Sequence, residues 1–192
     1  LQMTLTAPFP TLVHAAKAST NPYPATLSVS EGAAPAQSLA IQLRARGLTR
    51  RTGGYCQFPP LSLTFDKATV KETVFHGQHR LKLVTYCNTP SDQEQRIVLE
   101  YLAYRLYNLV TPASYRVRAA EVTYRTSEKD TGLERFGYVI EDIDDVAGRN
   151  HRERMKAATR QVTQAQLDPR AAGRAAMLEY MLGNLDWDFL AG

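Results

Sequence analysis

The chain has 192 residues, of which 44% are hydrophobic and 22% are charged. This composition is too apolar for a disordered chain, and two cysteines are too few for a fold built from disulfides. No apolar run approaches the ~20 residues that a membrane-spanning helix needs. The net charge of +4 suits an anionic ligand such as a nucleotide, and equally suits weak affinity for nucleic acid.

Residues 1–37 are expected to form an N-terminal extension. Prolines punctuate residues 1–24, where Phe9–Ala18 favours a short helix, and residues 26–30 alternate like a short strand. Residue 1 is Leu rather than Met, and an apolar segment, 185–192, follows the last expected helix. We therefore expect the sequence to be a piece of a longer protein.

Three strands are predicted at 38–46, 61–65 and 80–86, because apolar and polar residues alternate in each. A helix is predicted at 92–109, since Ser91 and Glu94 form a capping box. A stripe of leucine and valine follows at helical spacing, and we expect it to pack on the sheet. Its members are Val98, Leu99, Leu102, Ala103, Leu106, Leu109 and Val110.

The second half of the chain favours a hairpin followed by helices. Residues 115–125 and 135–142 are predicted strands joined by a charged turn. Residues 149–161 favour a surface helix, and Asp168-Pro169 begins another that runs to about Leu182. The order predicts an α+β fold, in which an antiparallel sheet carries one long helix and a helical part follows.

Lys82 and Glu100 are candidates for an ion pair at the interface between the sheet and the helix. Lys82 lies on the strand 80–86, and Glu100 lies about two turns into the helix. A lysine held in this way would neutralise phosphate oxygens, and phosphoryl transfer depends on positioned charge. The alternative is that both are solvated surface residues.

Polar turns supply further candidates. Asn184 and Asp186 follow the last helix, where Asp186 is placed to accept a proton from a substrate hydroxyl and Asn184 to orient the turn. The alternative is a simple helix cap. The acidic run Glu141, Asp142, Asp144 and Asp145 suits a metal or a ribose, or is a solvated turn. His76 and His79 lack partners at zinc-ligand spacing.

Cys56 and Cys87 leave two possibilities open. They are expected to form a disulfide if the chain is exported, and to be free thiols if it is cytosolic. An exported or periplasmic location is favoured over a cytoplasmic one.

The order of the segments resembles that of the CotH-type protein kinases, an atypical bacterial branch of the kinase-like superfamily. The stretches that carry the resemblance are 43–50 (LRARGLTR), 76–85 (HGQHRLKLVT), 99–106 (LEYLAYRL), 136–144 (FGYVIEDID) and the turn 183–186 (GNLD). The resemblance implies a kinase-like N-lobe at 38–144 and the beginning of a helical C-lobe at 145–192.

It also implies roles for particular residues. Lys82 would contact the phosphates of ATP and Glu100 would pair with it, while the loop at Arg46 would face the phosphates. Glu141 and Asp142 would lie near the adenine, and Asp186, in the turn with Asn184, would be the catalytic aspartate. ATP and Mg²⁺ are the implied cofactors of the longer protein, and a hydroxyl-bearing molecule, such as a protein, is the implied acceptor.

Departures from the family's pattern leave other functions open. Leu48 stands where the family has Asn, and the family's metal-binding aspartate would lie beyond Gly192. This piece alone is therefore expected to bind Mg²⁺-ATP weakly. A non-catalytic binding or surface-assembly domain is the main alternative. A nucleic-acid interface is a lesser one, built from Arg44, Arg46, Arg50 and Arg51 with Tyr55 and Phe58 for base stacking.

Overall fold

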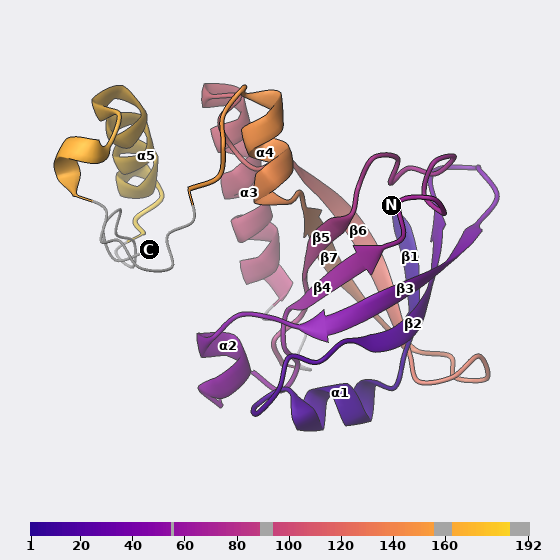
Figure 1. The fold of residues 1–192 in the computed structure, drawn as a ribbon. Coiled ribbons are helices and arrows are strands. Elements are labelled where there is room, and N and C mark those ends of the chain that lie inside the picture. Colours follow the sequence, from indigo (N-terminus) through magenta and orange to yellow (C-terminus); the bar gives the residue numbers. More distant parts are fainter. Residues whose placement is uncertain (55, 89–93, 156–162, 185–192) are drawn as a thin grey trace.

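Seven strands form a closed barrel in the order β1-β2-β3-β4-β5-β7-β6 (Figure 1). The computed structural model describes residues 1–54, 56–88, 94–155 and 163–184. The strands are β1 (Gln2–Thr6), β2 (Tyr23–Ser30), β3 (Gln37–Ala45), β4 (Leu61–Phe65), β5 (Arg80–Val84), β6 (Val117–Arg125) and β7 (Leu133–Ile140).

The predicted kinase-like N-lobe, with an antiparallel sheet and one long packed helix, is wrong. Strand β1 pairs antiparallel with β2 and parallel with β6, and this second pairing closes the sheet into a barrel. Both β1 and β2 lie within residues 1–37, for which only the short strand of β2 was expected. In a strand of five residues, only Met3 and Leu5 alternate with polar neighbours, which is too short a pattern to be recognised.

The barrel interior confirms the predicted strands at 38–46, 61–65 and 80–86. Alternate residues of β3, Leu39, Ile41 and Leu43, point into a buried core, and Leu81 and Leu83 of β5 join them. The side-chain period of two in a strand explains why alternation located these elements. Helix α1 (Phe9–Ala15), where a short helix was expected, covers one end of the barrel with Phe9 and Leu12.

Helix α3 (Glu94–Val110) packs on the outer face of β6 and β7, but through the opposite side from the one predicted. Ile97 is buried there, and the rings of Tyr101 and Tyr104 lie 5.6 and 5.9 Å from that of Tyr138. Aromatic side chains thus fill the interface. The leucine and valine stripe faces away from the sheet, and its exposed members are Leu99, Leu102, Leu106, Leu109 and Val110.

The remaining helices are short or unburied. Helix α2 (Thr49–Thr52) follows β3. Helix α4 (Ile143–Arg149) begins where Asp142 caps it, earlier than the surface helix expected at 149–161, and residues 150–155 are not helical. The cap explains the difference, because the Asp142 carboxylate accepts the free backbone N–H of Asp144.

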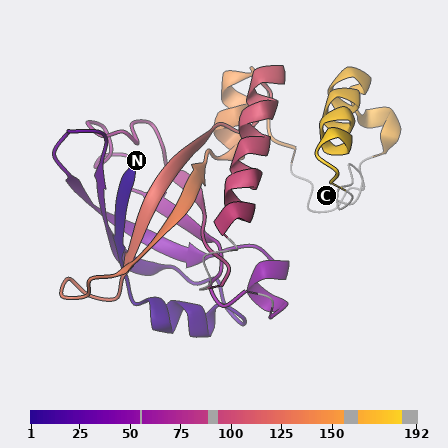
Figure 2. The same cartoon turned by 180° about the vertical axis from the view of Figure 1, so that it is seen from behind.

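Helix α5 (Pro169–Met181) begins at the predicted Asp168 cap, after a short 3-10 turn at Gln164–Gln166. No residue of α5 is buried, and the helix lies on the side of α3 and α4 that is remote from the barrel (Figure 2). Within the described ranges, no helix combines the length and apolar character that a bilayer crossing requires.

Candidate anion-binding site

Lys82 lies on the outer face of the barrel, between the inward-facing Leu81 and Leu83. In the sheet register it sits between Ser62 of β4 and Ile140 of β7. Its ammonium nitrogen lies 4.7 Å from the centroid of the Tyr115 ring, a cation–π contact. No carboxylate among the described residues forms an ion pair with it.

Arg46 brings a second positive charge to the same face. It follows β3 directly, where its backbone N–H donates to Pro60 and its Nε donates to the Leu61 carbonyl at 3.1 Å. Burial lowers the pKa of Arg46, and burial together with the charge of Arg46 lowers the pKa of Lys82. The two cations are therefore half-buried and close enough to repel each other.

Arg80 and Asp142 form an ion pair at the edge of this group. Arg80 Nε donates to Asp142 Oδ2 at 2.5 Å, and the other carboxylate oxygen caps α4. Burial raises the pKa of Asp142, but the bonds from Arg80 and Asp144 outweigh it and the net pKa is lowered. The charge of Asp142 acts on Lys82, but Arg80 already balances that charge.

Glu141 has a structural role in the described fold. Its Oε1 accepts from the backbone N–H of Arg116 and from Arg149 Nη2, each at 2.6 Å. Arg149 also donates to the carbonyls of Pro112 and Ser114. This buried pair ties α4 to the loop between α3 and β6, so Glu141 has little capacity left for a ligand.

Glu100 lies elsewhere than expected. It pairs with Arg50 of α2 at 3.5 Å, with both side chains 39% exposed, and no ion pair joins it to Lys82. Its charge also acts on Arg46 and on the buried Tyr138. Helix α3 packs on the sheet through its aromatic side. Glu100 therefore lies next to Arg50, which follows β3, and not next to Lys82.

The predicted catalytic turn is described only in part, since Asp186 lies outside the described residues. Asn184 follows α5, where its side chain donates to Glu179 Oε2 at 2.7 Å. Burial, then the charge of Glu100, raises the pKa of Tyr104, and Glu179 contributes to the same shift. Glu179 of α5 is therefore close enough to α3 to act electrostatically on Tyr104.

Two of the arginines predicted to bind nucleic acid, Arg50 and Arg51, are engaged in contacts within the protein. Arg51 donates through Nη1 to Ala16 at 2.5 Å and through Nε to Gly47 at 3.0 Å, so it fastens α2 to the region after α1. Arg50 pairs with Glu100. Tyr55 lies outside the described residues, and Phe58 packs with the barrel interior and not on the outer face that carries Arg46.

Sequence reasoning missed Arg80, Ser62 and Tyr115 as neighbours of Lys82. Arg80 had a signal, because residues two apart in a strand share a face. Ser62 and Tyr115 had none, since strand register and the path of the loop after α3 bring them to Lys82.

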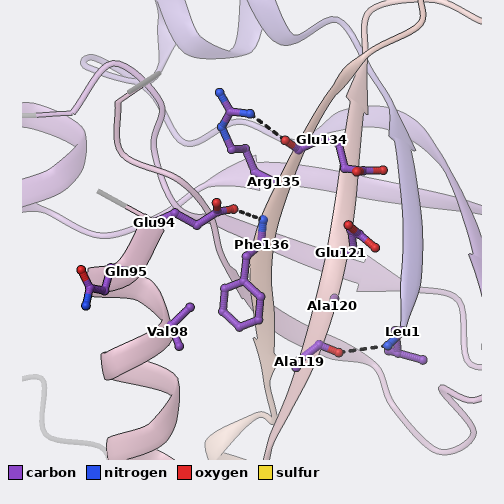
Figure 3. Close-up of a pocket in the computed structure, with 10 residues that line it drawn as sticks. All are labelled: Leu1, Glu94, Gln95, Val98, Ala119, Ala120, Glu121, Glu134, Arg135 and Phe136. Atoms are coloured by element: carbon purple, nitrogen blue, oxygen red, sulfur yellow. Dashed lines mark hydrogen bonds between the residues drawn. The ribbon is translucent and has the colours of Figure 1, made fainter. Parts of the chain in front are cut away.

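A cavity of about 750 Å³ lies elsewhere, between the first turn of α3 and the outer face of β6 and β7 (Figure 3). Glu94 accepts the backbone N–H of Phe136 there, and Glu121 and Glu134 add two more carboxylates. None of the predicted site residues lines it. Its three carboxylates outnumber the one guanidinium in the lining, that of Arg135, so the group around Lys82 is the better candidate for an anion.

We compared the chain with known protein families, curated proteins and solved structures. No family model, curated protein or solved structure matches the chain. Function is therefore inferred from the side chains.

Proposed function

We propose that the outer face of the barrel at Lys82 and Arg46 binds the phosphate groups of a nucleotide, with ATP as the expected ligand. One observation carries the proposal. Two half-buried cations lie on the outer face of the barrel, on or directly after strands separated only by β4, and neither has an ion-pair partner among the described residues. Such a pair costs free energy in the empty protein, and an anion would offset that cost.

The two side chains offer complementary contacts. Arg46 presents the planar fork that matches two phosphate oxygens, and Lys82 presents a compact charge. Tyr115 fixes the ammonium from one side. Bound phosphate would raise the pKa of Lys82 again, because it supplies the opposite charge that the site lacks.

Phosphoryl transfer to a hydroxyl acceptor is the further part of this proposal. Asp186 would accept the proton of the acceptor hydroxyl, and Asn184 would orient the turn. Mg²⁺ would neutralise charge between the phosphates in the longer protein. The support for this step is the resemblance of the turn 183–186 to the catalytic turn of the CotH-type kinases.

Isothermal titration calorimetry with ATP, ADP and adenosine tests the phosphate site. We expect Lys82→Met and Arg46→Met each to weaken ATP binding at least tenfold. The matched controls are Lys71→Met and Arg170→Met, which remove the same charges from exposed positions outside this group and should change affinity less than twofold. Equal losses in all four variants, or adenosine binding as tightly as ATP, would refute a phosphate site.

A non-catalytic binding domain is the second candidate, and the position of Glu100 favours it. With Glu100 on Arg50, Lys82 lacks the carboxylate that the kinase resemblance implies. The two candidates separate in the longer protein. Phosphoryl transfer that is lost in Asp186→Asn indicates an enzyme, whereas ATP binding without transfer indicates a binding domain.

A further inference from the structure

An aromatic cavity of about 280 Å³ opens at the end of the barrel that α1 covers. It lies where the turn between β6 and β7 passes α1, an approach fixed by the bond from the Ala7 N–H to the Arg125 carbonyl at 3.0 Å (Figure 1). It shares no lining residue with the group around Lys82. Its lining comprises Phe9, Phe58, Tyr86, Tyr124, Thr126, Asp130, Gly132 and Leu133.

Four rings form one connected aromatic surface in this cavity. Phe58 stacks on Tyr86 with centroids 4.7 Å apart, and both lie edge-on to Tyr124 at 5.2 and 5.4 Å. Phe9 closes the group, 5.6 Å from Tyr124. Aromatic faces carry a negative quadrupole and attract cations.

The disulfide between Cys56 and Cys87 holds two of these rings. Tyr86 is the neighbour of Cys87, and Phe58 stands two residues after Cys56. The backbone N–H groups of Gln57 and Phe58 both donate to the Cys87 carbonyl, at 2.9 and 3.0 Å. The stacked pair is therefore fixed before any ligand arrives, which lowers the entropic cost of binding.

The hydroxyl of Tyr124 is the feature that points to a ligand. Tyr124 is 5% exposed, and its hydroxyl has no hydrogen-bond partner in the described part of the chain. A buried polar group without a partner costs free energy, so its presence requires a reason. A ligand with a hydrogen-bonding atom in the cavity would satisfy it.

Asp130 supplies a fixed negative charge at the cavity. Its carboxylate accepts from the N–H and hydroxyl of Thr126 and from the N–H of Gly132, each at 2.9 Å. These bonds hold the pKa of Asp130 below its ordinary value, so the side chain stays ionised. Arg125 and Arg135 act electrostatically on Asp130 and Tyr86 respectively, but neither lines the cavity.

We propose that this cavity binds a small alkylammonium group that carries at least one N–H. The ring atoms that line the cavity would contact the cation, and Asp130 would balance its charge. The N–H would donate to the hydroxyl oxygen of Tyr124. A lysine side chain of a partner protein and a free amine present the same group, so both are sources of this chemistry.

Three probes of similar shape test the charge and the N–H separately: trimethylammonium, tetramethylammonium and tert-butanol. Changes in the aromatic NMR signals of Phe58 and Tyr86 report binding at millimolar concentration. We expect trimethylammonium to bind at least threefold more tightly than tetramethylammonium, and tert-butanol not to bind detectably. Equal binding of tert-butanol would overturn the proposal, as would no binding by either cation.

Two variants assign the contacts. Asp130→Asn should weaken both cations at least fivefold, with Glu128→Gln on the same turn as the control. Tyr124→Phe should abolish the preference for trimethylammonium while tetramethylammonium binds as before. An unchanged preference in a folded Tyr124→Phe protein would refute the role of the hydroxyl, and thermal melts establish that each variant is folded.

The source of the amine is settled with peptides that contain lysine or dimethyl-lysine, compared with free dimethylammonium. Peptide binding at least tenfold tighter than the free amine supports a protein ligand. Equal affinities support a small molecule. Failure of both to bind would overturn the proposal, and none of these results depends on nucleotide binding at Lys82.

Discussion

The inner and outer faces of the barrel are made by the same strands, but they differ in the kinds of side chain that they carry. On β5, Leu83 is fully enclosed while its neighbour Lys82 lies on the opposite face beside Arg46. The interior needs only apolar residues at every second position. The outer face combines charges and rings from distant segments, so its chemistry depends on which segments meet.

Helix α3 repeats this contrast on its own two sides. Tyr101 and Tyr104 pack on the outer face of the barrel, whereas Leu102 and Leu109 face away from it. Hydrophobicity alone favoured the leucines as the buried side. The aromatic side of α3 is the buried one because Tyr138 and Tyr115 present their rings to it, and Tyr104 packs against both.

Leu83→Ala gives the largest expected contrast with an exposed leucine. Leu83 is 0% exposed, and truncating an enclosed leucine costs about 2–5 kcal/mol of the free energy of unfolding. Leu109→Ala, at a position 84% exposed, should cost less than about 0.5 kcal/mol. Urea denaturation measures both. Similar losses in the two variants would mean that the leucine stripe is covered in solution.

Removal of the disulfide should have the next largest effect on the free energy of unfolding. Cys56 and Cys87 are 31 residues apart, and closing a loop of that length restricts the unfolded chain by about 3–4 kcal/mol. Cys56→Ala with Cys87→Ala should therefore lower the free energy of unfolding by about that amount. Coincident urea transitions of the oxidised protein and the double variant would contradict this expectation.

Glu141→Gln separates a buried ion pair from an exposed one. The substitution removes the negative charge that Arg149 pairs with, where the two side chains are only 20% and 10% exposed. The loss of charged hydrogen bonds there is expected to cost about 2–3 kcal/mol of the free energy of unfolding. Glu31→Gln breaks the exposed pair with Arg118 and should cost less than about 1 kcal/mol. Chemical denaturation at one pH compares them. A larger loss in Glu31→Gln would reverse our ranking of the two ion pairs.

Tyr138→Phe should change how stability depends on pH. Burial, then the charge of Glu100, raises the pKa of Tyr138, so it stays neutral in the folded protein while the unfolded tyrosine ionises near pH 10. Stability present below pH 10 is therefore lost as the pH rises above it. Between pH 9 and 11, the free energy of unfolding should fall by about 1 kcal/mol less in the variant than in the wild type. Urea denaturation at each pH measures this difference. Parallel pH profiles would place the Tyr138 hydroxyl in water.

The sequence indicated individual residues of the candidate site but not that they lie close together. Lys82 stood out as a charge between apolar neighbours on a strand, and Arg46 as a charge at the end of one. Their proximity was not predictable, because Arg46 reaches this face only through the pairing of β3 with β4 and of β4 with β5. Glu100 was assigned to Lys82 because the direction of the helix face cannot be read from spacing alone.

The sequence by itself determined the alternating strands β3, β4 and β5, the start of α5 at Asp168 and the length of α3 to within two residues. These are local matters of side-chain period and backbone capping. Tertiary structure alone decided the closure by β1, the face on which α3 packs, the disulfide and the meeting of Arg46 with Lys82. Each of these depends on contacts between segments far apart in the chain, which no local pattern encodes.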